Sequence, residues 1–393
     1  MPAASGGDPL HGPRRFFDSI GNFWQRVTEG MEIQSLWAQF TAEARSSYSL
    51  YTREVDWDAY KRETGPKRFF KVARSLFWAM LMKLSPARRV FLLLALVFAL
   101  LAVTAFRVET GDKQFQVVAP QNTTFILLSV GGLVFLLALE LADRVTMKRD
   151  LEIAREIQHW LTPEKPPVVP GADIAFISRP ANTVGGDYYD AFVLDGNENG
   201  PPKRLMMVIA DVAGKSVPAA LLMATFQASL RSLTTSSISL ADLVTGMNRY
   251  ACAHSLGGRR FTTAFFAELD LQSRALRYIS AGHNPPIVER ASGQLERLEV
   301  SNLPLGIVSS REYAAGESVL RPGDRLIIFT DGLVESMNSA EQEYGEKRLL
   351  ETLKTIPVES APKTLAALLA SVDAFTKGAR QHDDLTCLIL HVA

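Results

Sequence analysis

Aspartate residues stand at four separate places in the C-terminal half of the chain, each beside an apolar run. Asp187 lies in VGGDYYD, Asp211 begins DVAGK, Asp331 follows LIIFT, and the pair Asp383 and Asp384 precedes LTCLIL. A single aspartate beside glycine usually caps a turn. Four such sites at the ends of apolar runs indicate a cluster of carboxylates, which would repel one another unless a cation neutralises them.

The kind of ligand indicates which cation the cluster holds. Carboxylate oxygens without an accompanying His or Cys constellation favour Mg²⁺ or Mn²⁺ over Zn²⁺. Cys252 and Cys387 have no CxxC spacing and no neighbouring His cluster, so they predict reduced thiols rather than a zinc site or a disulfide. Two hard cations can bind a phosphate ester, activate a water and stabilise the attacking and leaving oxygens of an in-line displacement.

The elements that must position these carboxylates alternate between strand and helix beyond Gly171, which predicts a mixed α and β domain. The expected strands cover residues 173–179, 205–210, 261–269, 276–280, 325–329 and 385–392. The expected helices cover residues 218–233, 240–254 and 361–377. Because the last strand follows the last helix, the C-terminus can return to a central sheet.

The motifs in this region resemble those of a known family. In chain order they are AREIQ (154–158), VGGDYYD (184–190), DVAGKSVPAALLM (211–223), AGHNPP (281–286), LPLGI (303–307), PGD (322–324), TDGLVE (330–335) and DDLT (383–386). This ordered set looks like the SpoIIE/RsbU branch of the PPM protein phosphatases and covers residues 150–393. The resemblance implies an α+β fold, an α/β/β/α sandwich with two metal ions, Mn²⁺ or Mg²⁺, in a cleft between the sheet edges.

The resemblance also implies a role for each motif residue. Asp211 would bridge both ions, with Asp187 and the Val212 carbonyl on one ion, Asp331 and Asp383 on the other, and Asp384 as the alternative to Asp383. The nucleophile would be a metal-bound water, so no covalent intermediate is implied. His283 is a candidate general acid, but its Gly and Pro neighbours favour a structural turn.

One position departs from the family pattern, which usually reads Gly-Lys-Gly where this chain has Gly214, Lys215 and Ser216. A residue other than glycine is tolerated there only if its backbone avoids a positive φ. The exchange removes no metal ligand. All the expected carboxylates are present, so the sequence does not predict an inactive relative.

Two apolar runs precede this domain, at residues 90–106 and 125–141. Their lengths predict a two-helix transmembrane hairpin within residues 88–142, and the short polar loop between them disfavours the alternative of a buried core helix pair. Basic residues precede the first run and follow the second, which predicts that both flanks are cytoplasmic. The expected location is a bacterial cytoplasmic membrane, crossed more than once, with the catalytic domain (residues 163–393) in the cytoplasm.

The remaining segments flank the hairpin. Residues 1–87 predict a cytoplasmic helical region without a chemical motif; its part at 68–84 mixes aromatic and basic side chains and suits either the lipid headgroup region or a small helical bundle. Residues 140–162 contain no Gly or Pro and predict a linker helix (143–162). That helix can dimerise through a seam of Met147, Leu151, Ala154 and Leu161, the alternative being a monomeric helix packed on the next domain.

Together these features predict a membrane-anchored, metal-dependent protein serine/threonine phosphatase. The resemblance implies a phosphoprotein substrate, a STAS-domain antagonist of an anti-sigma factor in bacterial partner switching. With 42 basic and 42 acidic residues, the chain gives no reason to expect a nucleic acid partner. A non-catalytic membrane scaffold that binds a phosphorylated partner, and a two-metal hydrolase of small phosphoesters, are the alternatives. The intact carboxylates count against the scaffold, and no GxxxxGK[ST] loop supports nucleotide chemistry.

Overall fold

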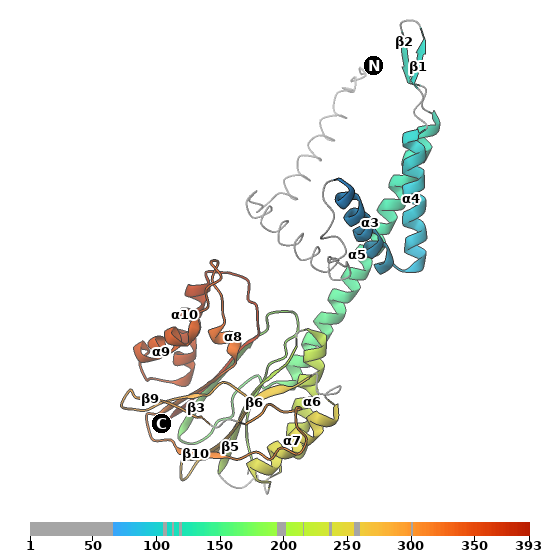
Figure 1. Ribbon diagram of the computed structural model, residues 1–393. Helices are drawn as coiled ribbons and strands as arrows, with labels where there is room; N and C mark the ends of the chain where they lie inside the picture. Colours follow the sequence, from blue (N-terminus) through green and yellow to red (C-terminus); the bar gives the residue numbers. More distant parts are fainter. Residues whose placement is uncertain are drawn as a thin grey trace, which may run out of the picture. The chain divides into compact units, whose positions relative to one another are not determined.

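The computed structural model describes residues 66–104, 108–111, 114–117, 120–194, 202–214, 216–235, 238–254, 260–299 and 302–393 (Figure 1). The helices expected before residue 66 lie outside these ranges, as does Lys215. The chain divides into two compact units, Met1–Asp143 and Arg144–Ala393, each of which is described by itself.

The first unit contains the predicted hairpin. Helix α3 (Pro66–Lys83) precedes α4 (Pro86–Thr104), and α5 (Pro120–Leu161) follows a short β-hairpin of β1 (Val108–Gly111) and β2 (Gln114–Val117). Both α4 and α5 are long and apolar enough to cross a membrane. Only 11% and 6% of their apolar windows are buried, whereas a core helix pair would be mostly buried, so the structure disfavours the core alternative.

Helix α5 does not end where the second apolar run ends. It continues without a break from Pro120 to Leu161 and therefore contains both the second predicted span and the predicted linker. The sequence allowed this continuity, because Gly and Pro are absent between residues 140 and 162.

The second unit is an α/β/β/α sandwich, as predicted (Figure 1). One antiparallel sheet has the order β10-β7-β6-β5-β4, with β4 Tyr188–Val193, β5 Arg204–Val212, β6 Thr262–Asp270, β7 Ala275–Ala281 and β10 Gly316–Val319. The other has the order β3-β12-β11-β8-β9, with β3 Ala172–Arg179, β8 Ile287–Glu289, β9 Leu295–Arg297, β11 Arg325–Phe329 and β12 Leu385–Val392. Helices α6 (Val217–Leu233) and α7 (Leu240–His254) cover the first sheet; α8 (Asp331–Val334), α9 (Gly345–Thr355) and α10 (Ala361–Thr376) lie on the second.

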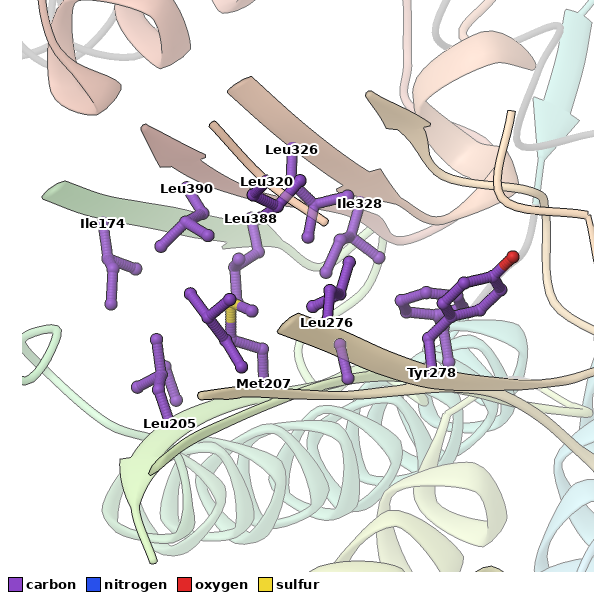
Figure 2. Close-up of a cluster of buried hydrophobic side chains, with 14 of the residues drawn as sticks. Ile174, Leu205, Met207, Leu276, Tyr278, Leu320, Leu326, Ile328, Leu388 and Leu390 are labelled. Carbon is purple, nitrogen blue, oxygen red and sulfur yellow. The ribbon is translucent and has the colours of Figure 1, made fainter. Parts of the chain in front are cut away.

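Strand β5 shows how the sequence builds these layers. Its residues at odd positions, including Leu205 and Met207, point into the core between the sheets, where they meet Leu388 and Leu390 of the second sheet (Figure 2). Its residues at even positions pack against α6 and α7. Because successive side chains of a strand face opposite sides, Asp211 continues the odd-numbered face and emerges at the end of the inter-sheet core.

The six predicted strands and three predicted helices are confirmed, and β12 lies between β3 and β11, so the C-terminus does return to a central sheet. The sequence pattern did not predict strands β4, β8, β9 and β10 or helices α8 and α9. Strands β8 and β9 have three residues each and α8 has four, which is too short for a periodic pattern.

A fully buried ion pair joins the second sheet to its helices. The Arg325 guanidinium donates to Oε2 of Glu289 at 2.6 Å from Nη2 and 3.1 Å from Nε. It also donates to Oγ1 of Thr364 in α10 at 3.0 Å and to the carbonyls of Leu353 and Ile356 at the end of α9, at 3.3 and 3.2 Å. One side chain thus connects β11, β8, α9 and α10.

We predict that Arg325→Met lowers the free energy of unfolding of residues 144–393 by about 3–5 kcal/mol, because Glu289 would be left buried without its partner. The matched control is Arg277→Met, since Arg277 pairs with Glu317 on the surface, where the change should stay below about 1 kcal/mol. Urea denaturation measures both. Equal stability of Arg325→Met and wild type would show that the pair does not hold the layers together.

Candidate metal centre

The strand order brings the four acidic motifs to one end of the sandwich. Asp187 directly precedes β4, and the pairing of Tyr188 with Ala210 places Asp187 opposite Asp211 at the end of β5. In the other sheet, Asp331 begins α8 directly after β11, and Asp383 directly precedes Asp384 and the neighbouring strand β12.

Two threonines of the second sheet hold Asp187 of the first. Oδ2 of Asp187 accepts hydrogen bonds from Oγ1 of Thr330 at 2.9 Å and from Oγ1 of Thr386 at 2.6 Å. Both threonines are fully buried, and the Thr386 amide donates to Oγ1 of Thr330 at 2.9 Å. These bonds cross from one sheet to the other at the acidic end, so they fix the separation of the motifs.

Asp187 is buried among other carboxylates. Only 6% of its surface is exposed. Burial raises the pKa of Asp187 well above its ordinary value, and the nearby charges of Asp211 and Asp384 raise it further, while the threonine hydrogen bonds oppose the shift. The ionised form of Asp187 thus lacks a compensating positive charge, which a bound cation would supply.

Asp384 holds the loop that carries Asp187. Its Oδ1 accepts the Ala181 amide at 2.7 Å and its Oδ2 accepts the Gly186 amide at 2.6 Å. A Cβ atom at Gly185 would lie 2.6 Å from Oδ2 of Asp384, so only glycine permits this approach. Both carboxylate oxygens of Asp384 therefore accept hydrogen bonds from the 181–186 loop.

The other predicted ligands lie around this loop. A Cβ atom on Gly186 would lie 3.0 Å from the Val212 carbonyl oxygen, which places that carbonyl against the residue before Asp187. At Gly332, a Cβ atom would clash with the Asp384 carbonyl, so the turn that carries Asp331 packs on the Asp383–Asp384 backbone. The turns that carry the predicted ligand residues therefore lie next to one another.

The donor set fits a hard divalent cation. Among the residues that the structure describes, no three His, Cys, Asp or Glu side chains converge closely enough to form a ready metal cage. Mg²⁺ does not need one, because it keeps several waters and is bound through one or two carboxylates. Aspartate oxygens, a main-chain carbonyl and uncompensated charge at Asp187 are the features such an ion requires.

The sequence reading did not recognise the role of Gln158 in the AREIQ motif. Gln158 Nε2 donates to the Gly185 carbonyl at 2.7 Å, and the Gly185 amide donates to Gln158 Oε1 at 3.1 Å. The C-terminal part of α5 thereby holds the backbone two residues before Asp187. An open cleft of about 760 Å³ between this part of α5 and strands β3 and β4 reaches Gly185 and Asp187.

His283 does not have the properties of a general acid. Burial lowers the pKa of His283 to about 4, so its ring is neutral at pH 7 and has no proton to give as an imidazolium. The ring hydrogen-bonds to the backbone of Phe329, the residue before Thr330, and so supports the turn that carries Asp331. This placement agrees with the structural role that its Gly and Pro neighbours indicated.

Ser216 has a backbone that glycine adopts more readily. Its φ is 65° and its ψ is −148°, a region that is essentially restricted to glycine, and it begins α6 without a side-chain capping hydrogen bond. A residue other than glycine was expected at position 216 only with a backbone that avoids a positive φ, and Ser216 does not meet that condition. The chain retains the conformation of the family's glycine with a residue that is strained in it.

Comparison with known proteins identifies relatives for this domain. Residues 201–393 match the model of the family described as Stage II sporulation protein E (SpoIIE). The chain is 27% identical over 282 residues to Protein IcfG of Synechocystis sp., covering 65% of this chain and 43% of IcfG. It is 29% identical over 247 residues to the phosphoserine phosphatase RsbU of Bacillus subtilis, covering 62% of this chain and 70% of RsbU.

A solved structure shows the same fold. The SiaA-PP2C domain of Pseudomonas aeruginosa superposes with a TM-score of 0.56 at 19% identity, covering 64% of this chain and 99% of that domain. The chain spans less than half the length of IcfG.

We predict that Ser216→Gly stabilises residues 144–393 by about 1 kcal/mol or more, because glycine removes the strain at φ 65°. Ser229→Gly is the matched control: the same exchange inside α6 should destabilise by about 0.5–1 kcal/mol. Thermal unfolding of the two variants should therefore shift in opposite directions. A loss of stability in Ser216→Gly would contradict the strained backbone.

Proposed function

Because residues 201–393 form a SpoIIE-family domain of the PPM phosphatases, we propose that the chain is a membrane-anchored, metal-dependent protein serine/threonine phosphatase. One observation carries the proposal: aspartates from four motifs far apart in the sequence meet at one end of the sandwich, with one of them buried in excess negative charge. The 29% identity to a protein named phosphoserine phosphatase supports phosphoserine as a substrate group.

The proposed ligand roles are those implied by the resemblance of the motifs to the SpoIIE/RsbU branch. Asp211, which lies opposite Asp187, would bridge two ions; Asp187 and the Val212 carbonyl would bind one ion, and Asp331 and Asp383 would bind the other. Asp384 has both oxygens engaged by amides, which favours Asp383 as the ligand from that pair. When bound, Mn²⁺ or Mg²⁺ supplies Lewis acidity that neutralises phosphoryl charge and activates the attacking water.

We predict that residues 144–393 hydrolyse p-nitrophenyl phosphate and phosphoserine peptides only with Mn²⁺ or Mg²⁺ present. Asp211→Asn should reduce kcat/KM at least about 100-fold, which corresponds to about 2.7 kcal/mol of transition-state stabilisation. Calorimetry should show weakened Mn²⁺ binding in the same variant.

The matched control is Asp150→Asn, an exposed aspartate on α5 away from the acidic motifs, which should leave both measurements unchanged. Full activity of wild type in a chelator, or full activity of Asp211→Asn, would contradict a metal-dependent mechanism.

The proposed substrate is a cytosolic phosphoprotein, a STAS-domain antagonist of an anti-sigma factor. Its support is the resemblance of the ordered motifs to the SpoIIE/RsbU branch, together with the identity to RsbU. The proposed location is the bacterial cytoplasmic membrane, with both flanks of the α4–α5 hairpin in the cytoplasm. Two largely unburied apolar helices and the basic residues that flank them support that topology.

A dimer through the linker helix is also proposed, but through a different face of α5. Leu151, Ala154 and Leu161 of the predicted seam are partly buried within the chain. Met147 of that seam is exposed, and beside the seam Ile153, Ile157 and Trp160 form a second stripe at helical spacing, in which Trp160 is 73% exposed. This second stripe is the better candidate for contact with a second copy.

We predict that Gln158→Leu lowers kcat at least about tenfold, because the loop before Asp187 loses both hydrogen bonds to α5 and small displacements of catalytic groups are costly. Glu156→Gln, an exposed position on the same helical turn, is the control and should keep wild-type kcat. Unchanged kcat in Gln158→Leu, with the variant folded by circular dichroism, would mean that α5 does not position the loop.

A further inference from the structure

Four large apolar side chains gather on the surface beside the candidate metal centre: Phe261, Leu303, Ile307 and Val308, here called the apolar rim. Each is between 40% and 46% exposed. Single exposed apolar residues are common on soluble domains, but a group held together beside a functional site indicates an interaction surface. Within the described part of the chain, no other segment covers these side chains beyond that extent.

The backbone under the rim is held rigidly. Buried Leu305, in the middle of the loop, exchanges hydrogen bonds with Thr262 at 2.9 and 3.0 Å. The side chain of buried Asn248, from α7, accepts the Gly306 amide at 3.0 Å and donates to the Val308 carbonyl at 2.8 Å. Because these hydrogen bonds already order the loop, it would lose little conformational entropy when a partner binds.

Further contacts join the loop to its surroundings. The hydroxyl of Tyr313 donates to the Leu303 carbonyl at 3.1 Å. A Cβ atom on Gly306, where φ is 90°, would lie 3.0 Å from the Arg260 carbonyl oxygen, so the loop packs directly against the backbone beside Phe261. Phe261 on one segment therefore lies next to the exposed side chains of the other segment, Leu303 and Ile307.

The rim adjoins the loop that carries Asp211. The Ala213 amide donates to the Phe261 carbonyl at 2.9 Å, and Asp211 pairs with Thr263 across β5 and β6. The backbone of Phe261 therefore lies beside the residues that follow Asp211. A protein substrate whose phosphate reaches the acidic centre would lie close to this surface.

From this geometry we propose that the apolar rim is the docking surface for the folded phosphoprotein substrate, which presents an apolar patch next to its phosphorylated residue. The proposal rests on the phosphatase function proposed above and deepens it. The four rim side chains are apolar, so they would contribute to binding by burial of apolar area, while the adjacent Arg260, which donates to the Ala213 carbonyl at 3.2 Å, supplies a positive charge beside them. On this proposal a small phosphate ester does not need the rim, because it has no apolar protein surface to bury there.

The test compares a small ester with cellular phosphoproteins for the full chain. Ile307→Glu and the milder Ile307→Ser are placed in the rim; Val358→Glu, an equally exposed valine between α9 and α10, is the control. Each purified variant is assayed with p-nitrophenyl phosphate and Mn²⁺. Quantitative phosphoproteomics then compares cells that carry each variant with cells that carry wild type or Asp211→Asn.

The proposal expects p-nitrophenyl phosphate turnover within about twofold of wild type in both rim variants. The phosphosites whose occupancy rises in Asp211→Asn cells should rise in Ile307→Glu cells too, with about a tenfold loss of dephosphorylation rate, and less in Ile307→Ser. Val358→Glu cells should match wild type.

Three results would overturn the proposal. Wild-type phosphosite occupancy in Ile307→Glu cells would show that the rim does not bind the substrate. If Ile307→Glu lost p-nitrophenyl phosphate turnover to the same extent as protein dephosphorylation, the rim would be part of the catalytic scaffold. If Ile307→Glu changed the monomer–dimer equilibrium measured by light scattering, the rim would be a contact with a second copy. An Asp211→Asn strain without altered phosphosites, by contrast, would count against the phosphatase function itself.

Discussion

Burying a carboxylate beside other carboxylates is unfavourable, because desolvation and repulsion both oppose its ionised form. Asp187 is in that position: it is almost fully buried, with Asp211 across the strand pair and Asp384 nearby. A fold keeps such an arrangement only if the surrounding structure enforces it. The hydrogen bonds from Thr330 and Thr386 do so, and they come from the opposite sheet. The relation between the two sheets is therefore set at the acidic end as well as in the apolar core.

The sandwich architecture makes this convergence possible. Strand β5 is apolar on both faces because it is covered by the second sheet on one side and by α6 and α7 on the other. Its two polar residues, Arg204 and Asp211, lie near its opposite ends, and Asp211 emerges at the acidic end of the sandwich. In the second sheet, β11 pairs with β12. The turn from β11 into α8 therefore lies beside the Asp383–Asp384 turn that leads into β12. Small residues at Gly185 and Gly332 let these backbones approach closely.

Much of this arrangement could be predicted from the sequence, for definite reasons. Strands β5, β11 and β12 are strongly apolar, and glycines lie beside Asp187 and Asp331, so the chain pattern indicated where these acidic turns meet strands. The bonds of Gln158 and Asp384 could not be predicted, since they join residues 27 and 198 positions apart through backbone groups that leave no sequence signal. Asp190 in the VGGDYYD motif shows the converse. It is also an aspartate of that motif, but it pairs with Arg231 at 2.7 Å and accepts a hydrogen bond from the Tyr188 hydroxyl, so it joins α6 to β4.

The central claim is that the gathered aspartates hold two divalent ions, and locating the ions tests it most directly. Crystals of residues 144–393 grown with MnCl₂ would give manganese positions from anomalous diffraction. The account predicts two anomalous peaks adjacent to Asp211, one on the side of Asp187 and the Val212 carbonyl and the other on the side of Asp331 and Asp383. Manganese bound elsewhere on the domain with none at Asp211 would contradict it.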